Sequence, residues 1–321
     1  MLNEKTDVDL GLETVAFLRA RYQVEDEWIQ VRERGFRWWP AELEQEVWAE
    51  PAWDDGGIVV WRVHVRTDLL CELDGGGRAV EWLASVARTI GSLSAPIVEC
   101  GDGRRVRLAA SVYVHGQNLD WTHPLLAWVG LMQVAEARLW AQVADETGVA
   151  RAGWSTHPVT GPRRVPDELT GIVDKVILPR GRGPSPFVGI DMEECLRFAQ
   201  RPPVVLATGG PDGVTVEVPF NRRTSLVQVR ADARHPVLGS GLLVLLTLPV
   251  TATGAAQALE LNRHELEAGV RTKLMGSWVP DETGLSFAAF YPSAVRQEGL
   301  AVNLLLGMLQ RARWAAETLR P

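Results

Sequence analysis

Two segments, PLLAWVGLMQVAEARLWAQVADETG (residues 124–148) and GLAVNLLLGMLQRARWAAETL (residues 299–319), decide how this chain folds. In each, apolar residues recur at steps of three and four, which places them on one face of a helix. The recurring residues are Leu125, Trp128, Met132, Ala135, Leu139 and Val143 in the first segment, and Leu305, Leu309, Ala312, Ala316 and Leu319 in the second. Each helix closes a run of short β-prone segments, so the sequence predicts one structural unit that occurs twice.

The residues before each helix predict the same order of elements. Residues 57–67 (GIVVWRVHVRT) alternate apolar and polar side chains, which is typical of a strand buried on one face, with its other face wet or covered. Residues 241–250 (GLLVLLTLPV) are an unbroken apolar run that fits a central strand of the second half. Helices are expected at 9–21 and 78–90 in the first half and at 192–200 and 254–267 in the second. A hairpin is expected around GDGRR (101–105), and another around Pro280 to Gly284.

Both halves therefore follow the order α-β-β-β-α-β-β-α, and matching landmarks are nearly evenly separated along the chain. The separation is 177 for Leu108 and Leu285, 177 for Gly130 and Gly307, and 174 for Trp140 and Trp314. Such an order predicts an α+β fold of two tandem two-layer sandwiches, each with an antiparallel sheet and helices on one face. The second copy can cover the free sheet face of the first, or the two can meet edge to edge as an intramolecular pseudo-dimer.

Domain limits follow from composition. Residues 1–150 form the first repeat, and residues 187–321 form the second. Six prolines between His157 and Phe187 exclude a continuous helix or central strand. Residues 151–186 are therefore a connection rich in proline and glycine, with one short helix expected at 167–178.

Composition narrows the function classes. The chain has 321 residues, 46% hydrophobic residues and a net charge of -7, which indicates a globular protein and argues against non-specific binding to nucleic acid. No signal-like start or membrane span is evident, so we expect a cytoplasmic protein that does not contact membranes. The cysteines Cys71, Cys100 and Cys195 lack metal-binding spacing and favour a reducing compartment.

No motif predicts catalysis. The DGGGR segment (74–78) lacks a nucleotide-binding glycine pattern, and NRHELE (262–267) lacks the second histidine of a zinc helix. No G-x-S-x-G occurs, and the histidines show no ligand spacing. We therefore predict no catalytic residue, no cofactor and no metal.

Two groups of residues are candidates for binding a partner. Tryptophan is unusually common, with 13 residues, and Trp38, Trp39, Trp48 and Trp53 lie close together in an acidic N-terminal stretch of 14 acidic and 6 basic residues (1–55). Tryptophan suits surfaces that are partly apolar and partly wet, although core packing is the alternative. The polar side of the first sheet forms the second group, and an acidic or extended peptide would suit its arginines, although a solvated face is the alternative. Its predicted members are Arg62, His64, Arg66, Arg105 and Arg107.

The element order, with LMGSWVPDETGLSFAAFYP (274–292) followed by residues 299–319, resembles the type III secretion chaperone-like fold, including its YbjN-like branch. The resemblance covers both halves and implies proteins that hold a polypeptide segment without altering it covalently. This chain differs from the secretion chaperones in being fused as a pair and rich in tryptophan.

The leading hypothesis is a non-enzymatic protein-binding module, acting as chaperone, adaptor or regulator on a protein or peptide client. One alternative is an enzyme with a cleft between the halves, using His64 or His115 with the acidic stretch. Another is a structural subunit of a larger assembly. Whether the whole chain forms a homodimer is left open.

Overall fold

The computed structural model describes residues 8–71, 77–99, 105–201, 204–250, 254–267, 273–281 and 284–319, and these form two antiparallel sheets with helices packed on them. The strands of the first sheet are, in spatial order, β1 (Ile29–Arg32), β2 (Gly35–Trp38), β3 (Gln45–Ala49), β5 (Val59–Cys71), β7 (Arg105–Val114) and β6 (Ala95–Glu99), with β4 (Trp53–Asp54) and β8 (Arg151–Ala152) paired to β5. Its helices are α1 (Leu10–Tyr22), α2 (Gly77–Ile90) and α3 (Leu119–Thr147).

The second sheet repeats this arrangement. Its strands are, in spatial order, β9 (Leu206–Gly210), β10 (Gly213–Phe220), β11 (Arg223–His235), β12 (Gly239–Leu248), β14 (Gly284–Pro292) and β13 (Ser277–Asp281). Its helices are α5 (Ile190–Ala199), α6 (Ala255–Glu267) and α7 (Leu300–Thr318). The α+β class and the two antiparallel sheets are thus confirmed. Among the described residues the first sheet has eight strands and the second has six, whereas the predicted order gives five strands in each half.

The repetition extends to the register of strand pairing. Val65 pairs with Ala110, and Val244 pairs with Ala289, in each case 179 residues further along the chain. By the same pairing Leu108 corresponds to Phe287, so matching Leu108 with Leu285 was wrong by two residues. A shift of two leaves every side chain on its original face of the strand, which is why the sequence pattern could not detect the error.

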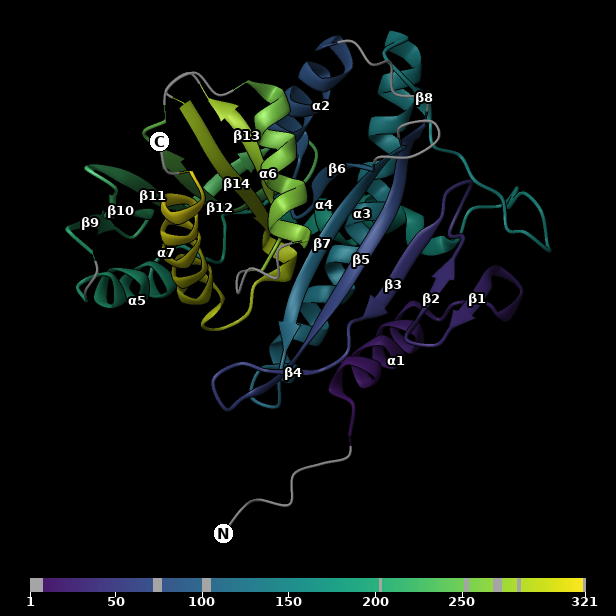
Figure 1. Cartoon of the computed structure of the whole chain (residues 1–321), viewed down its shortest axis with the longest axis horizontal. Helices are drawn as coiled ribbons and strands as arrows, with labels where there is room; N and C mark the ends of the chain where they lie inside the picture. Colours follow the sequence, from purple (N-terminus) through teal and green to yellow (C-terminus); the bar gives the residue numbers. More distant parts are fainter. Residues whose placement is uncertain are drawn as a thin grey trace.

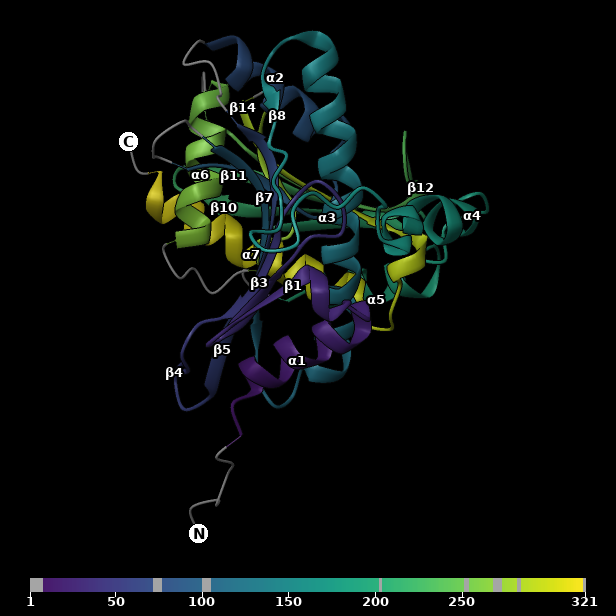
Figure 2. The same cartoon turned by 90° about the vertical axis from the view of Figure 1, so that its right-hand side faces the viewer.

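Helices α1 and α3 cover one face of the first sheet, and Figure 2 shows α3 on one side of β5 and β7 with α6 on the other. Tyr22 of α1 and Trp38 of β2 stack in this core, with ring centroids 5.4 Å apart. The Trp38 indole N–H donates to Gln45 Oε1 at 2.9 Å, and Gln45 in turn donates to Thr67 and to the Gly130 carbonyl. These bonds satisfy the indole N–H of Trp38 and the side-chain amide of Gln45 inside the core.

The inner edges of the two sheets meet in a reciprocal junction (Figure 1). Helix α2 packs on β13 of the second half, α6 packs on β6 of the first half, and α2 also contacts α6. The Ser111 N–H donates to the Leu274 carbonyl at 3.0 Å, and the Phe290 N–H donates to the Ser92 carbonyl at 3.1 Å. Ser92 lies three residues before the first residue of β6, and Leu274 lies three residues before the first residue of β13. The two bonds are therefore equivalent under a pseudo-twofold rotation that relates the halves. The prediction that the helices gather on one face of the sheet therefore holds for α1 and α3. Helix α2 instead packs in the junction between the halves.

The connection between the halves packs against both of them, with α4 (Leu178–Gly181) on β12 of the second half and its earlier part on the first half. The Arg163 guanidinium donates to the Trp39 carbonyl at 3.1 Å and to the Glu25 carboxylate at 2.7 Å. Instead of one helix at 167–178, this part forms a 3-10 turn (Glu168–Gly171), a π-helical turn (Val173–Ile177) and α4 (Leu178–Gly181). Pro179 has no backbone N–H to donate to the preceding turn, so it interrupts the predicted helix, and the α-helical part is confined to α4.

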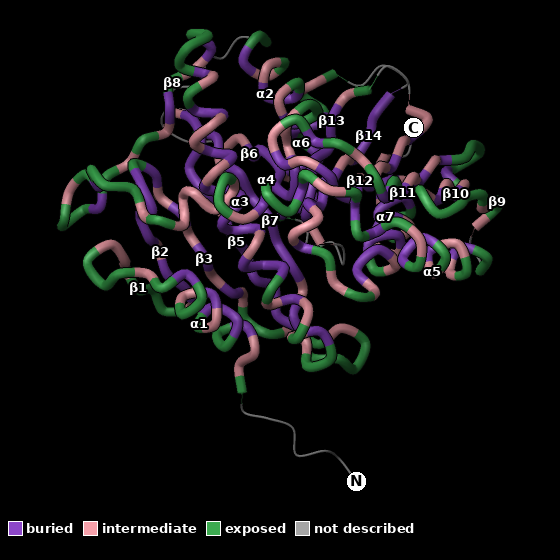
Figure 3. The backbone as a smooth tube through the Cα atoms, turned by 180° about the vertical axis from the view of Figure 1, so that it is seen from behind, coloured by how far each residue is buried: buried purple, intermediate pink, exposed green. Residues whose placement is uncertain are grey.

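The outer edges of both sheets are more exposed than the junction, and Figure 3 shows exposed segments around β1 and β9. The predicted turns at residues 74–76 and 101–104 lie outside the described residues. Cys195 is fully buried and burial raises its pKa to about 12, so this thiol behaves as a small apolar side chain.

Substitution by alanine should have opposite effects on stability at Gly130 and Gly307, the two glycines that the sequence pattern matched. A Cβ at Gly130 would lie 2.0 Å from the Tyr22 hydroxyl, whereas a Cβ at Gly307 would meet no atom within 4 Å. We expect Gly130→Ala to destabilise the fold by about 1–3 kcal/mol through overpacking. We expect Gly307→Ala to stabilise it by up to about 1 kcal/mol through helix propensity. Urea unfolding of both variants checks this, and equal effects would contradict the close contact between α1 and α3.

Candidate functional site

One face of the first sheet, opposite α1 and α3, concentrates charged and aromatic side chains, and we call it the polar face. Cross-strand neighbours share a face, so the register places these residues together. Its members are Arg37, Glu44, Glu46, Trp48, Arg62, His64, Arg66, Asp68, Glu99, Arg105, Arg107, Ser111 and Tyr113. The alternation in β5 thus gives the predicted result, with Val63 and Val65 in the core and the two arginines and the histidine on the other side.

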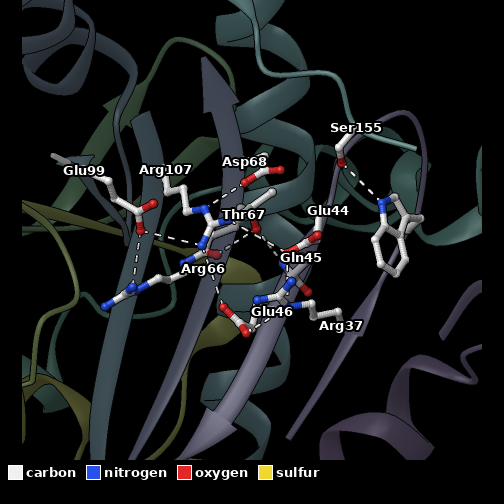
Figure 4. Close-up of polar contacts among 12 residues, drawn as sticks. Arg37, Glu44, Gln45, Glu46, Arg66, Thr67, Asp68, Glu99, Arg107 and Ser155 are labelled. Atoms are coloured by element: carbon white, nitrogen blue, oxygen red, sulfur yellow. Dashed lines mark hydrogen bonds and ion pairs between the residues drawn. The ribbon is translucent and has the colours of Figure 1, made fainter. Parts of the chain in front are cut away.

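Arg107 of β7 is the centre of an ion network on this face (Figure 4). Its guanidinium lies 2.8 Å from Asp68, 3.6 Å from Glu99, 3.7 Å from Glu46 and 3.9 Å from Glu44. Two further arginines share these carboxylates. Arg37 lies 3.0 Å from Glu46 and 3.4 Å from Glu44, and Arg66 lies 3.3 Å from Glu99.

Partial burial gives this network its electrostatic character. Burial raises the pKa of Asp68 and of Glu44, and the charge of Arg107 offsets part of that effect. For Arg107 itself, burial opposes the charged form, but the surrounding carboxylates outweigh it and raise the pKa. The arginine therefore favours the ionised form of the carboxylates, and the carboxylates favour the charged form of the arginine.

An aromatic group adjoins the network. Trp48 stacks on His64 with ring centroids 4.5 Å apart, and the Arg66 guanidinium lies 4.7 Å from the centre of the Trp48 ring. His64 Nε2 lies 2.7 Å from Glu50 Oε1. Burial lowers the pKa of His64 to about 4 although this bond raises it, so the imidazole is neutral at pH 7 and donates Nε2–H to the Glu50 carboxylate.

The second half covers one end of the polar face. Arg62 is 1% exposed and donates from Nη2 to the Glu265 carbonyl of α6 at 3.0 Å, across the junction. The Glu265 carboxylate accepts from Arg311 at 2.6 Å and from the Trp278 indole at 2.8 Å. Glu265 therefore links the polar face to the core of the second half.

The structure separates the residues predicted from sequence into two groups. Trp48, Arg62, His64, Arg66 and Arg107 lie together on the polar face, as does Arg105, which is exposed at its margin. Trp53 contacts Tyr113 edge to face at 5.5 Å, next to Arg62.

Trp38 and Trp39 do not lie on the polar face. Trp38 is buried under the helices, and Trp39 is buried under the connection with its indole N–H donated to Ser155. Both sides of this strand are covered, so core packing accounts for the pair and we do not retain it in the candidate surface.

The later part of the acidic N-terminal stretch, from Ile29 onward, contributes strands β1 to β4 to the first sheet. Its Glu44, Glu46 and Glu50 lie on or beside the polar face and pair with basic groups there. The sequence analysis overlooked these carboxylates, although their two-residue spacing along β3 is a strand signal.

Glu50, His64 and Ser111 form the arrangement nearest to a hydrolytic triad. His64 pairs across the strands with Ser111, and the Ser111 hydroxyl and His64 Nδ1 have no hydrogen-bond partner within the described chain. Ser111 is completely buried, so a substrate cannot reach its hydroxyl. His115, the other histidine considered, lies near Lys273, and its pKa is lowered by burial and by that lysine. These histidines therefore give little support to an enzyme.

A cleft of about 740 Å³ lies between the halves, but neither His64 nor His115, the histidines predicted for such a cleft, lines it. One wall is the outer surface of α3, the opposite wall is the connection, and the turn between β11 and β12 closes one end. Glu136 of α3 and His235, the last residue of β11, line it, and they are only 6% and 8% exposed. Their sequence signals were weak, because a single acid in an apolar helix and a histidine before a proline each have ordinary explanations.

Glu136 and His235 are both uncharged at pH 7. Burial raises the pKa of Glu136 to about 8, although the hydrogen bonds from Ser92 lower it in part. Burial lowers the pKa of His235 to about 4, and its Nδ1 accepts from the N–H groups of Val237 and Leu238 at 3.1 Å. The neutral ring therefore carries its proton on Nε2.

Among the described residues, no three His, Cys, Asp or Glu side chains are grouped to hold a metal ion, and no helix is long and apolar enough to cross a membrane. No protein-family model, curated protein or solved structure matches this chain.

We expect Arg107→Ser to destabilise the fold by about 2 kcal/mol at pH 8, because it removes the arginine that pairs with the buried Asp68 carboxylate and one of the two that neutralise Glu44. In this variant the folded-state pKa values of Asp68 and Glu44 rise further above their unfolded values. The stability that these carboxyl groups contribute in their neutral form is present at low pH and is lost as the pH rises. The difference in the free energy of unfolding between the variant and the wild type should therefore shrink towards pH 4. Urea unfolding across this range measures it, with exposed Arg105→Ser as the matched control. An equal deficit at both ends of the range would contradict the network.

Glu136 predicts a second pH dependence. Its folded pKa of about 8 exceeds the unfolded value of 4.5, so its contribution is fully present below pH 4.5 and is lost as the pH rises to 8. We expect Glu136→Gln, which stays neutral, to exceed the wild type in stability at pH 9 by roughly 3–5 kcal/mol, with little difference at pH 4. Chemical unfolding between pH 4 and 9 checks this. Exposed Glu146→Gln on the same helix is the control and should follow the wild-type profile.

Proposed function

We propose that this chain is a non-enzymatic protein-binding module whose polar face holds an extended polypeptide segment. The two halves act as an intramolecular pseudo-dimer, with the second half supporting the first. The resemblance to secretion chaperone-like proteins points to the same class of function, a chaperone, adaptor or regulator.

The observation that carries this proposal is the difference between the two halves at matched positions. In the register shared by the sheets, His64 corresponds to Leu243, Arg66 to Leu245 and Arg107 to Ser286. Along β3 and β11, Glu46 corresponds to Gln228. The same fold in the same chain thus forms this face with few charges, so the fold does not require the network.

Charged groups at such positions are costly unless something requires them. Partly burying an arginine or a carboxylate removes water from it, and replacing such a network with apolar residues is often neutral or stabilising. The second half makes that replacement with Leu243 and Leu245. A binding role explains why the first half retains the charges.

The chemistry of the polar face defines the expected partner. Positive and negative groups alternate across β2, β3, β5 and β7, so a partner of a single charge sign would meet repulsion as well as attraction. An extended segment with acidic and basic residues in alternation can exchange ion pairs with the network without leaving a charge unpaired. Trp48, half-buried over His64, offers a flat apolar contact beside these charges.

The test is selection of peptides from a random displayed library with the whole chain as bait. The comparison bait carries Trp48→Arg and Arg66→Leu, which introduce the residues found at the matched positions Arg230 and Leu245 of the second half. We expect the wild type to enrich peptides of alternating charge, and the double variant to bind them at least tenfold more weakly.

A second bait, Leu245→Ala, alters the corresponding face of the second half and should retain wild-type binding. Urea unfolding of each bait establishes that it is folded. If the double variant is folded and binds every selected peptide as the wild type does, or if no peptide is enriched, the proposal is wrong.

A further inference from the structure

The cleft between the halves is separate from the polar face, and its wall contains a carboxyl group without a sufficient partner. Ser92, in the turn after α2, donates a short hydrogen bond to Glu136 Oε1, while Glu136 Oε2 has no partner within the described chain. Burial and the bonds from Ser92 account for the shift of its pKa, with no contribution from a neighbouring charge. A buried carboxyl of this kind lacks the cation that would keep it ionised.

The charges around the cleft indicate which kind of ligand would supply that cation. Four exposed carboxylates line it, and they are Glu42, Asp145, Glu146 and Asp174. Of the three arginines in its lining, Arg163 is already engaged by Glu25 and Asp167, which leaves Arg138 and Arg164. The cleft therefore has an acidic balance, and it concentrates cations rather than anions.

The other groups near Glu136 are compatible with a cation. His235 is neutral at pH 7, and Ile90, at the C-terminal end of α2, places the carbonyl end of that helix at the cleft. Leu139 and Val237 supply apolar contacts, and Trp154, which is 48% exposed, offers an aromatic face near the opening. Aliphatic carbon and a positive charge both suit these surroundings.

We propose that the cleft is a binding site for an organic ammonium ion, of the class of aliphatic diamines and polyamines, with one ammonium paired to the Glu136 carboxylate and the other to the acidic lining. The Glu136 Oε2 atom is shielded from water, so its side chain turns towards the cleft as the ligand enters. The site joins α3, the connection and the β11–β12 turn, so its occupation links the two halves.

Pairing with an ammonium requires Glu136 to give up its proton. The free protein holds that proton at pH 7, because its pKa is about 8. Binding at pH 7 should therefore release about one proton to the buffer, and affinity should rise as the pH approaches 8. His235, which lines the same cleft at the end of β11, has a pKa of about 4 and is already neutral at pH 7, so the proton is assigned to Glu136.

The experiment is isothermal titration calorimetry of the full chain with putrescine and with spermidine, at pH 7 in two buffers of different ionisation enthalpy. We expect both amines to bind, with a heat that depends on the buffer. Glu136→Gln should weaken binding at least tenfold and abolish the buffer dependence. Asp145→Asn, in the exposed lining, should weaken it only about twofold to threefold and keep the buffer dependence.

Two compounds of similar length serve as controls for charge. 1,4-Butanediol is neutral and succinate is anionic, and we expect neither to bind. Glu136→Gln is expected to be at least as stable as the wild type, so unfolding does not explain a loss of binding. Failure of both amines to bind, equal binding to the Gln variant, or binding of succinate would each overturn the proposal. None of these results bears on peptide binding by the polar face.

Discussion

The arrangement of this protein depends on how two sheets cover each other's inner edges. A sheet edge leaves backbone N–H and C=O groups unpaired, and small domains must protect such edges. Here α2 packs on β13 and α6 packs on β6, and the bonds from Ser111 to Leu274 and from Phe290 to Ser92 join the halves at equivalent places. The junction is formed from the same elements on both sides, as in a twofold dimer, but within one chain.

That junction also determines where the functional candidates lie. On one side, the end of α6 reaches the polar face, where the Glu265 carbonyl accepts a bond from Arg62. On the other side, the end of α2 reaches the cleft, where Ser92 bonds to Glu136. The two candidate sites are therefore both formed where a helix of the junction ends.

Duplication has allowed the two halves to differ while the backbone stays the same. The register of β5 with β7 recurs in β12 with β14, yet Leu243 and Leu245 occupy the positions that match His64 and Arg66. In the second half, Arg311 and Trp278 both donate hydrogen bonds to the Glu265 carboxylate inside the core. The first half retains an ion network around Arg107 that the fold does not require, and this difference is the basis of the binding hypothesis.

The sequence by itself determined the class, the repeat and the alternation of β5, because periods of 3.6 and 2 follow directly from helix and strand geometry. It also placed Arg62, His64, Arg66 and Arg107 on one face. It could not fix the match of Leu108 to within two residues, since that shift preserves facing, and it could not tell that Trp39 is covered by the connection. Only the tertiary structure decided that Glu136 is buried beside a cleft with its Oε2 unpaired. The reason is that burial and pairing depend on segments far apart in the chain, here α3, the connection and the β11–β12 turn, whose approach no local pattern encodes.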